Sequence, residues 1–280
     1  MEKQINKDLM EVSLQNLAKF NIEIREDEIL VDDKLYCSKC NTPRTTTIDV
    51  LGNKRTVRCS CQCQKINEME IKKQVRIAEL KKESGISDRY KDASFDTCKT
   101  NENESFDIAF NRCKKYCENS DEILKKGYGI YLWGDKGTGK THLTACMANE
   151  LTNQCKNVLF TNFFEISRTI RATFKGKGNE IDVINKIANI DFLFIDDLGT
   201  EKVTKENEDT WLQEKVYEII NIRYNNMLPT IFTSNYSLQE LVQERGLMDK
   251  TVDRILGMST AIIKVEGRSN RSIRVKNDLF

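Results

Sequence analysis

The sequence predicts an α/β fold built on a parallel five-stranded sheet, because short apolar segments alternate with helical segments over residues 85–280. This alternation is typical of a parallel sheet that helices cover on both faces. We expect strands at residues 129–133, 158–163, 192–197, 230–235 and 261–267. We expect helices at residues 140–153, 164–174, 181–190, 208–226 and 238–257, the last in two pieces.

The composition indicates the cellular compartment and limits the classes of partner that are expected. The 280 residues carry 44 basic and 43 acidic side chains, and a net charge of +1 gives no reason to expect a polyanion outside a local patch. No segment approaches the roughly 18 apolar residues of a membrane span, and the start, MEKQINKDLMEV, lacks the apolar core of a signal peptide. We therefore expect a cytoplasmic protein without membrane contact, whose ten cysteines stay reduced and bind metal where they cluster.

Three regions of the chain differ in character. Residues 1–63 combine a polar, helix-forming start, which runs to about residue 34, with a cysteine-rich stretch that is strand-like around a turn at Gly52-Asn53. The starting helix either binds a partner or packs on its own domain. Residues 64–84 are helical and highly charged, which predicts a connector helix. Residues 85–280 form the larger domain, so a small helical and metal-binding domain precedes the α/β domain.

The strongest chemical signal follows the first strand of the larger domain. Residues 134–141 read GDKGTGKT and fit the phosphate-loop pattern G-x-x-x-x-G-K-[ST] between a strand and a helix. Backbone N–H groups of such a loop face the phosphates, Lys140 reaches the β and γ phosphates, and the Thr141 hydroxyl binds Mg²⁺. The sequence therefore predicts ATP and Mg²⁺ binding through Gly134, Asp135, Lys136, Gly137, Thr138, Gly139, Lys140 and Thr141.

A later apolar strand, FLFIDD, ends in the acids Asp196 and Asp197. An apolar strand holds acids at its exposed carboxyl end, which in a parallel sheet lies beside the phosphate loop. We assign Asp196 to the Mg²⁺ ion and Asp197 to general-base activation of the attacking water. The alternative, that the pair only caps a helix, is weakened by the complete phosphate loop upstream.

Five cysteines crowd into residues 37–63. Cys37 and Cys40 form one C-x-x-C pair, and Cys59, Cys61 and Cys63 supply a second pair and one spare thiol. Tetrahedral zinc takes four ligands, and its binding would fold a segment too poor in apolar residues to fold alone. Free surface thiols and an iron–sulfur cluster are the alternatives. His142 is expected to pack and to take no part in chemistry. The remaining cysteines are expected to be small core residues, and they are Cys98, Cys113, Cys117, Cys146 and Cys155.

The order of the motifs resembles that of the AAA+ ATPases. A phosphate loop, an aspartate-ended strand, a strand ending in Asn235 and a helical segment with Arg254 match Walker A, Walker B, sensor 1 and arginine finger. Within that superfamily, residues 85–280 resemble the DnaC/DnaI-type helicase loaders and their IstB-like relatives. The phrases that carry the resemblance are YLWGDKGTGKTHL, FLFIDDLG, IFTSN, VDRILG and EGRSNR, and ISDRYKDASFD resembles the family's leader near the adenine.

The resemblance implies further residues of the ATP site. Asn235 would help to place the attacking water, and Arg254 would complete the site of a neighbouring subunit, which implies self-association through the ATPase domain. Without the family, an arginine in such a helix would be read as solvated or salt-bridged. Arg271 falls where the family carries a late basic residue near the nucleotide, and Arg268 is the competing candidate.

The resemblance also bears on the zinc ligands. CQCQK resembles the end of zinc modules that precede the ATPase in loaders of phages and Gram-positive bacteria. It favours Cys61 and Cys63 together with Cys37 and Cys40, whereas Cys59 with Cys61 is the alternative second pair.

A patch of basic and aromatic residues follows the second strand of the larger domain. Such side chains can hold a single nucleic-acid strand, although a solvated helix face with phenylalanines in the core explains the same residues. The family resemblance favours single-stranded DNA. The residues are Arg168, Arg171, Lys175 and Lys177, with Phe163, Phe164 and Phe174 interleaved.

These resemblances imply an ATP hydrolase that loads a hexameric DnaB-type replicative helicase onto single-stranded DNA during replication initiation, encoded by a phage or a bacterial mobile element. Residues 1–63 would grip the helicase. One alternative is an IstB-like ATPase helper of DNA transposition, which the zinc module argues against. The other is a non-catalytic adaptor, which the intact Lys140, Asp196, Asp197 and Arg254 argue against.

Overall fold

A computed structural model describes residues 23–32, 34–98, 103–174, 178–200 and 207–267, with side chains from Thr210 onward in the last range. The chain divides into two compact units, residues 1–75 and 76–280. The predicted starting helix lies outside the described residues up to residue 22, as do Lys175, Lys177, Arg268 and Arg271.

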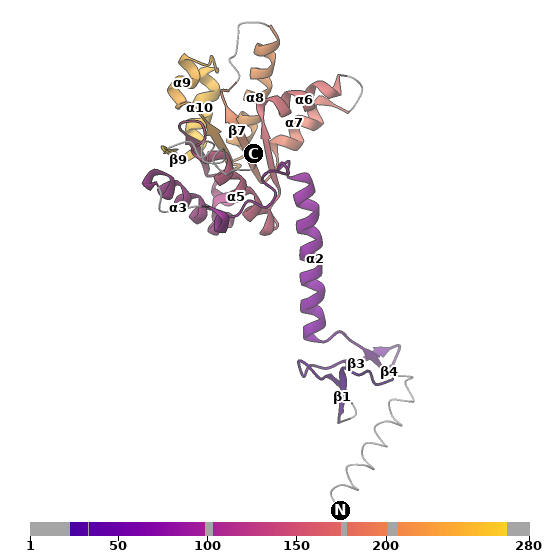
Figure 1. Cartoon of the computed structure of the whole chain (residues 1–280). Coiled ribbons are helices and arrows are strands. Elements are labelled where there is room, and N and C mark those ends of the chain that lie inside the picture. Colours follow the sequence, from indigo (N-terminus) through magenta and orange to yellow (C-terminus); the bar gives the residue numbers. More distant parts are fainter. Residues whose placement is uncertain (1–22, 33, 99–102, 175–177, 201–206, 268–280) are drawn as a thin grey trace, which may run out of the picture. The chain divides into compact units, whose positions relative to one another are not determined.

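Two β-hairpins build the described part of the first unit (Figure 1). Strand β1 (Glu28–Val31) pairs antiparallel with β2 (Lys34–Cys37), and β3 (Thr45–Val50) pairs antiparallel with β4 (Asn53–Arg58). The predicted helical start was wrong for residues 28–31, because Asp32 has a left-handed φ of 45° and turns the chain back into β2. The second hairpin was predicted, with its turn at Leu51-Gly52 instead of Gly52-Asn53.

The first unit has few buried apolar side chains among its described residues, so polar contacts and thiols take their place. Arg44 is 3% exposed and forms ion pairs with Asp27 and Glu28, and Arg58 also pairs with Glu28. These contacts tie the first hairpin to the second. Leu35 is the large apolar side chain at the centre of this unit, and its backbone N–H donates to the Thr45 hydroxyl at 3.2 Å.

Helix α2 (Gln62–Glu83) covers the predicted connector of residues 64–84. The boundary between the two units falls inside this helix, after Val75. In the part that belongs to the second unit, Ile77 and Leu80 are buried, whereas Ile66, Met69 and Ile71 in the first unit are exposed. The proposed division into domains at residues 63 and 84 stays a prediction.

A five-stranded parallel sheet forms the centre of the second unit and confirms the predicted fold. Its strands lie in the order β6-β7-β8-β5-β9, and every neighbouring pair is parallel. The strands are β5 (Gly129–Trp133), β6 (Val158–Asn162), β7 (Phe192–Leu198), β8 (Thr230–Ser234) and β9 (Ser259–Lys264). Strand β5, which leads into the phosphate loop, therefore lies between β8 and β9.

Helices cover both faces of this sheet, as the apolar strands predict. Tyr131 of β5 packs with residues of one helix group, whereas its neighbours Ile130 and Leu132 pack with those of the other. The first group is α6 (Phe163–Thr173), α7 (Glu180–Ala188), α8 (Asn207–Asn225), α9 (Leu238–Gln243) and α10 (Asp249–Met258). The second is α3 (Glu104–Glu118), α4 (Ser120–Lys126) and α5 (Lys140–Asn153) (Figure 1).

Two of these helices, α3 and α4, were not among the predicted elements. Asn103 caps α3 by accepting hydrogen bonds from the backbone N–H groups of Ser105 and Phe106, and Gly127 ends α4 with a left-handed φ of 70°. Among the helices that the structure describes, none is both long enough and apolar enough to cross a bilayer.

A buried arginine near the C-terminal end of α8 contacts the end of α7 and the start of β8. Arg223 is inaccessible to solvent and donates to the carbonyl oxygens of Ala188, Ile190 and Pro229 and to the Thr230 hydroxyl at 2.5–2.9 Å. Burial lowers the pKa of this guanidinium to about 9. The charge is therefore stabilised by peptide dipoles around it.

We expect Arg223→Leu to lower the free energy of unfolding by about 3 kcal/mol or more, because several buried carbonyl groups lose their donor at once. Urea unfolding of the full chain, followed through Trp133 and Trp211 of the second unit, measures the change. Arg168→Leu, whose side chain is 70% exposed, is the matched control and should stay within about 0.5 kcal/mol of the parent chain. Equal effects of the two substitutions would contradict the assigned role.

Candidate nucleotide and metal sites

The phosphate loop connects the buried strand β5 to helix α5. Gly134 has a φ of 137° and lies so close to Val265 that a Cβ atom would collide with the Val265 carbonyl oxygen. Gly139 has a φ of 97° and forms the N-terminal cap of α5, which begins at Lys140. These glycines let the loop turn tightly and direct the N-terminus of α5 toward the place where phosphates bind.

Lys140 lies within this loop and is 6% exposed. Its ammonium group donates to the carbonyl oxygens of Gly134 at 2.7 Å and Asp135 at 2.8 Å. It also donates to the side-chain oxygen of Asn235 at 3.2 Å. The cation is therefore held at the loop and is joined directly to the end of β8.

Asp196, on β7, contacts Thr141, which directly follows Lys140. The Thr141 hydroxyl donates to the Asp196 carboxylate at 3.0 Å, and the Thr233 hydroxyl donates to the same oxygen at 2.6 Å. Burial raises the pKa of the Asp196 carboxyl above its ordinary value, and the hydrogen bonds from Thr233 and Thr141 oppose that rise. A hydroxyl and a carboxylate in contact are oxygen ligands of the kind that Mg²⁺ takes, so Thr141 and Asp196 fit the predicted metal role.

Asp197 and Asn235 form a second pair beside the first. The Asn235 amide donates to the Asp197 carboxylate at 2.7 Å, so Asn235 contacts both Lys140 and Asp197. The register between β7 and β8 is irregular between Ile195 and Leu198, and Asp197 has a left-handed φ of 57°. This irregularity turns Asp197 out of the regular strand and toward Asn235.

Arg254 lies on α10 and contacts residues of α8 and α10. Its guanidinium donates to Asn221 at 3.1 Å and to Asp253 at 3.1 Å, and lies 4.7 Å from the centre of the Tyr224 ring. The structure does not bring it to the phosphate loop of the same chain through any of these contacts. A role in a neighbouring subunit's site stays a prediction, and so does the role of Arg271, which lies outside the described residues.

Thr233 is a site residue that the sequence reading missed. Its hydroxyl donates to Asp196 and accepts from the backbone N–H of Asp197 at 2.8 Å. The available signal was its place in IFTSN, directly before the polar end of β8.

The segment at the start of the larger domain docks on α5. The side chain of Asn149 donates to the backbone oxygens of Tyr90 at 2.9 Å and Ala93 at 2.8 Å. Ala93 packs with Ala145 and Cys146 of α5. The segment ISDRYKDASFD is therefore fixed to the same helix that begins at the phosphate loop.

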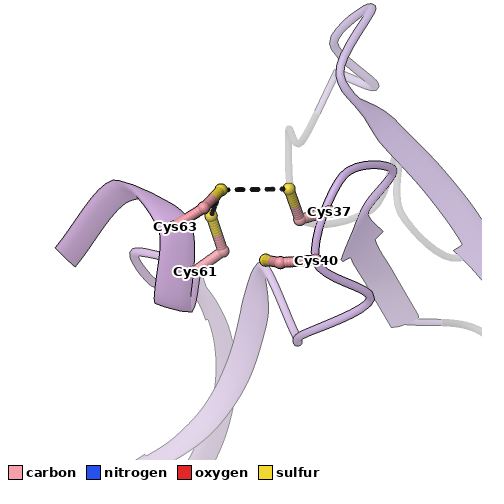
Figure 2. Close-up of side chains that lie close together, drawn as sticks. All are labelled: Cys37, Cys40, Cys61 and Cys63. Atoms are coloured by element: carbon pink, nitrogen blue, oxygen red, sulfur yellow. Dashed lines mark hydrogen bonds between the residues drawn. The ribbon is translucent and has the colours of Figure 1, made fainter. Parts of the chain in front are cut away.

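Four of the five N-terminal cysteines come together in the first unit, as Figure 2 shows. The sulfur atoms of Cys37, Cys40, Cys61 and Cys63 all lie within 4.8 Å of one another, and those of Cys37 and Cys63 are 3.6 Å apart. Thiolates of one tetrahedral zinc ion lie about 3.8 Å apart, given Zn–S bonds of about 2.3 Å. The donor set therefore fits zinc, and binding of the metal stays a prediction.

Local geometry explains why these four residues converge. Asn41 has a left-handed φ of 51° and its N–H donates to the Cys37 carbonyl, which turns the chain between Cys37 and Cys40. Cys63 lies in the first turn of α2, and its sulfur contacts those of Cys61 at 3.2 Å and Cys37 at 3.6 Å. A hydrogen bond from the Thr42 side chain is the main cause that lowers the pKa of Cys40 to about 5.

Cys59 lies outside this group. Its sulfur contacts the Pro43 carbonyl oxygen at 3.4 Å. The geometry therefore agrees with Cys61 and Cys63 as the second pair and not with the alternative that includes Cys59.

We expect Cys40→Ser to lower the zinc content of the full chain by about one ion, because the first unit has few buried apolar side chains to hold the other three ligands in place once the four-thiolate set is broken. Cys59→Ser is the matched control and should leave the zinc content unchanged. Elemental analysis of the purified chains measures both. Loss of zinc from the Cys59→Ser chain would instead support Cys59 as a ligand.

Fold and site together define a P-loop ATP-binding protein of the AAA+ type. The chain belongs to the IstB-like ATP binding protein family, whose model matches residues 67–278. It is homologous to the replicative helicase loader DnaC of Escherichia coli K12, with 29% identity over 184 residues that cover 64% of this chain and 70% of the relative. It is also homologous to the replicative helicase loader DnaI of Bacillus subtilis 168, with 29% identity over 157 residues that cover 52% and 48%.

The fold agrees with a solved structure from the same group. A crystal structure of the DnaC helicase loader aligns with a TM-score of 0.54 and 24% identity, and covers 64% of this chain and all of the solved one. This likeness supports the AAA+ fold of the second unit. It carries no information about the chemistry, which depends on the residues of the site. The predicted resemblance to the DnaC/DnaI-type helicase loaders is confirmed, whereas an origin in a phage stays a prediction.

Proposed function

We propose that the protein hydrolyses ATP to load a hexameric, DnaB-type replicative helicase onto single-stranded DNA during replication initiation. The observation that carries the proposal is the joint presence of a hydrogen-bonded Lys140–Asn235–Asp197 site and 29% identity to two helicase loaders. The site supplies the ATP chemistry, and the relatives suggest the purpose that it serves.

The proposed hydrolysis uses groups at the ends of three strands. Lys140 and the N–H groups of the phosphate loop bind the β and γ phosphates, and Asp197 accepts a proton from the attacking water while Asn235 orients it. Thr141 and Asp196 would hold Mg²⁺, which neutralises charge on the phosphate oxygens. Asp196 cannot easily serve as the base as well, because its carboxylate is already engaged by two hydroxyls.

Arg254 is proposed to act in trans. A guanidinium that reaches the γ-phosphate of a neighbouring subunit stabilises the charge that spreads during phosphoryl transfer. In this chain Asn221 and the Tyr224 ring hold Arg254 on the surface of α10, with its side chain 33% exposed. Hydrolysis would then depend on self-association of the ATPase domain.

We expect Asp197→Asn to reduce ATP turnover by roughly 10²–10⁴-fold with little change in ATP affinity, because it removes the base and keeps the contact with Asn235. Arg254→Ala should reduce turnover while leaving the site of its own chain intact. If Arg254 acts in trans, an equimolar mixture of the two inactive variants regains part of the activity.

The mixing experiment separates this mechanism from simple damage. Phosphate release is measured for each variant and for the mixture. Arg112→Ala, which changes an exposed arginine on α3, is the control and should keep the parent rate. A mixture as inactive as its components would contradict the trans role, and full phosphate release by Asp197→Asn would contradict its role as the base. Absence of phosphate release from the parent chain would favour a non-catalytic adaptor.

Single-stranded DNA is the second proposed partner, and two exposed aromatic side chains support it. Phe164 and Phe174 at the ends of α6 are 60% and 63% exposed, whereas Phe163 packs against the core. The Phe174 ring also contacts the Trp211 ring, with the ring centres 5.6 Å apart. Arg168 lies on the same helix with its side chain 70% exposed. Aromatic and cationic groups on one surface can stack on bases and contact phosphates.

The first unit is proposed to grip the helicase. Zinc would be held by Cys37, Cys40, Cys61 and Cys63 and would supply structural stability. The adjoining hairpins expose apolar side chains, among them Ile29, Val31 and Leu51, which is 98% exposed. Exposed apolar groups on a small rigid module are suited to binding another protein.

A pull-down of a DnaB-type replicative helicase by the full-length chain, with ATP and without nucleotide, tests the proposal. We expect capture by the parent chain and by Cys59→Ser, and at least about tenfold weaker binding by Cys40→Ser, because zinc folds the binding module. No capture of the helicase under either condition would overturn the loader function. Binding to a transposase in the same assay would favour the IstB-like transposition helper.

A further inference from the structure

A second group of metal-ligand side chains lies in the ATPase unit, apart from the N-terminal cysteines. Cys98, His142 and Cys146 bring two sulfur atoms and an imidazole nitrogen within 4.8 Å of one another. His142 and Cys146 are four residues apart on α5 and share one face of that helix, whereas Cys98 directly follows the short helix η1 (Phe95–Thr97). Three donors from two separate segments therefore meet at one point.

We propose that Cys98, His142 and Cys146 bind a zinc ion, with a water molecule as the fourth ligand. The sulfur atoms of Cys98 and Cys146 are 3.7 Å apart, which matches the separation of about 3.8 Å between two thiolates on one tetrahedral zinc ion. Two thiolates and one imidazole form a ligand set that zinc accepts in proteins, with the fourth position open.

Charge and exposure agree with this assignment. Two thiolates neutralise Zn²⁺, so the metal brings no net charge into a region where Cys146 is fully buried. Cys98 and His142 are partly exposed, so solvent reaches the side on which the fourth ligand would bind.

Simple packing and a disulfide account for the cluster less well. A disulfide requires sulfur atoms about 2.05 Å apart, so Cys98 and Cys146 would have to move considerably to form one. Packing explains the contact of Cys146 with Ala93 and Ala145, and the His142 ring lies 6.3 Å from the Tyr90 ring, centre to centre. Neither contact requires an imidazole nitrogen and two sulfur atoms to lie within 4.8 Å of one another.

The site is held in shape by contacts that do not involve the metal ligands. Asn149 fixes the backbone at Tyr90 and Ala93 against α5, and the Phe95 ring packs edge-on against Phe110 with ring centres 5.5 Å apart. The segment that carries Cys98 is thus already docked on the helix that carries the other two ligands. Preorganised ligands bind a metal with a smaller entropic cost.

The proposed ion would join the leader segment to the first turn of α5. His142 follows Thr141, whose hydroxyl contacts Asp196. A metal bond to His142 would therefore hold the backbone next to the predicted Mg²⁺ ligand. The proposal assigns this ion a structural role beside the nucleotide site and no step in hydrolysis.

Zinc counting on the full-length chain tests the proposal. The chain is loaded with zinc under a phosphine reductant, freed of excess metal and measured by elemental analysis. We expect about two zinc ions per chain, about one in Cys40→Ser or His142→Gln, and almost none in the combined variant, because the two sites are independent. Cys155→Ser, which alters a partly exposed thiol of the same unit, is the control and should keep about two.

An unchanged zinc content in His142→Gln relative to the parent chain would overturn the proposal. Alkylation of the unaltered chain gives a second test that does not depend on the folding of a variant. Zinc should slow modification of Cys98 by about tenfold or more and leave Cys155 unaffected, because a metal-bound thiolate is a weaker nucleophile. Equal rates at Cys98 with zinc and with a chelator would also overturn it.

Discussion

The hydrogen bonds that join Lys140, Asn235 and Asp197 depend on one constraint, the parallel order β7-β8-β5. In parallel strands the carboxyl ends all lie at one edge, so the phosphate loop that follows β5 meets the ends of β7 and β8 there. Helices on both faces bury the sheet and fix that order. The ATP site is in this sense a property of the sheet, and the cluster of Cys37, Cys40, Cys61 and Cys63 is a separate arrangement in the other unit.

Much of the larger unit could be predicted because its signals are local. The apolar strands and the phosphate loop are continuous in sequence, and the pairs Lys140-Thr141 and Asp196-Asp197 follow directly from them. Helices α3 and α4 were not predicted because the order of polar and apolar residues there marks no clear helix boundary. In the structure, Asn103 caps the start of α3 and Gly127 caps the end of α4. Such caps depend on a single backbone conformation that composition does not reveal.

Other features could not be predicted because they arise from tertiary contact. The strand at residues 28–31 depends on a left-handed turn at Asp32, and the grouping of Cys98 with His142 depends on how the leader docks on α5. Cys59 and Cys63 are alike in sequence, and only the start of α2 at Gln62 separates the thiol inside the cluster from the one outside. The resemblance of CQCQK to the zinc modules of helicase loaders also favoured Cys61 and Cys63.

Thr233 gives the two acids a common mechanical support. One hydroxyl holds the side chain of Asp196 and the backbone of Asp197, while the adjacent Ser234 hydroxyl donates to the Leu198 carbonyl at 2.6 Å. A small displacement of β8 along its axis would therefore be transmitted to both acids together. A partner that shifts this strand would act on the proposed metal ligand and on the proposed base as a single event, so these two proposed roles could not be adjusted separately from that side of the sheet.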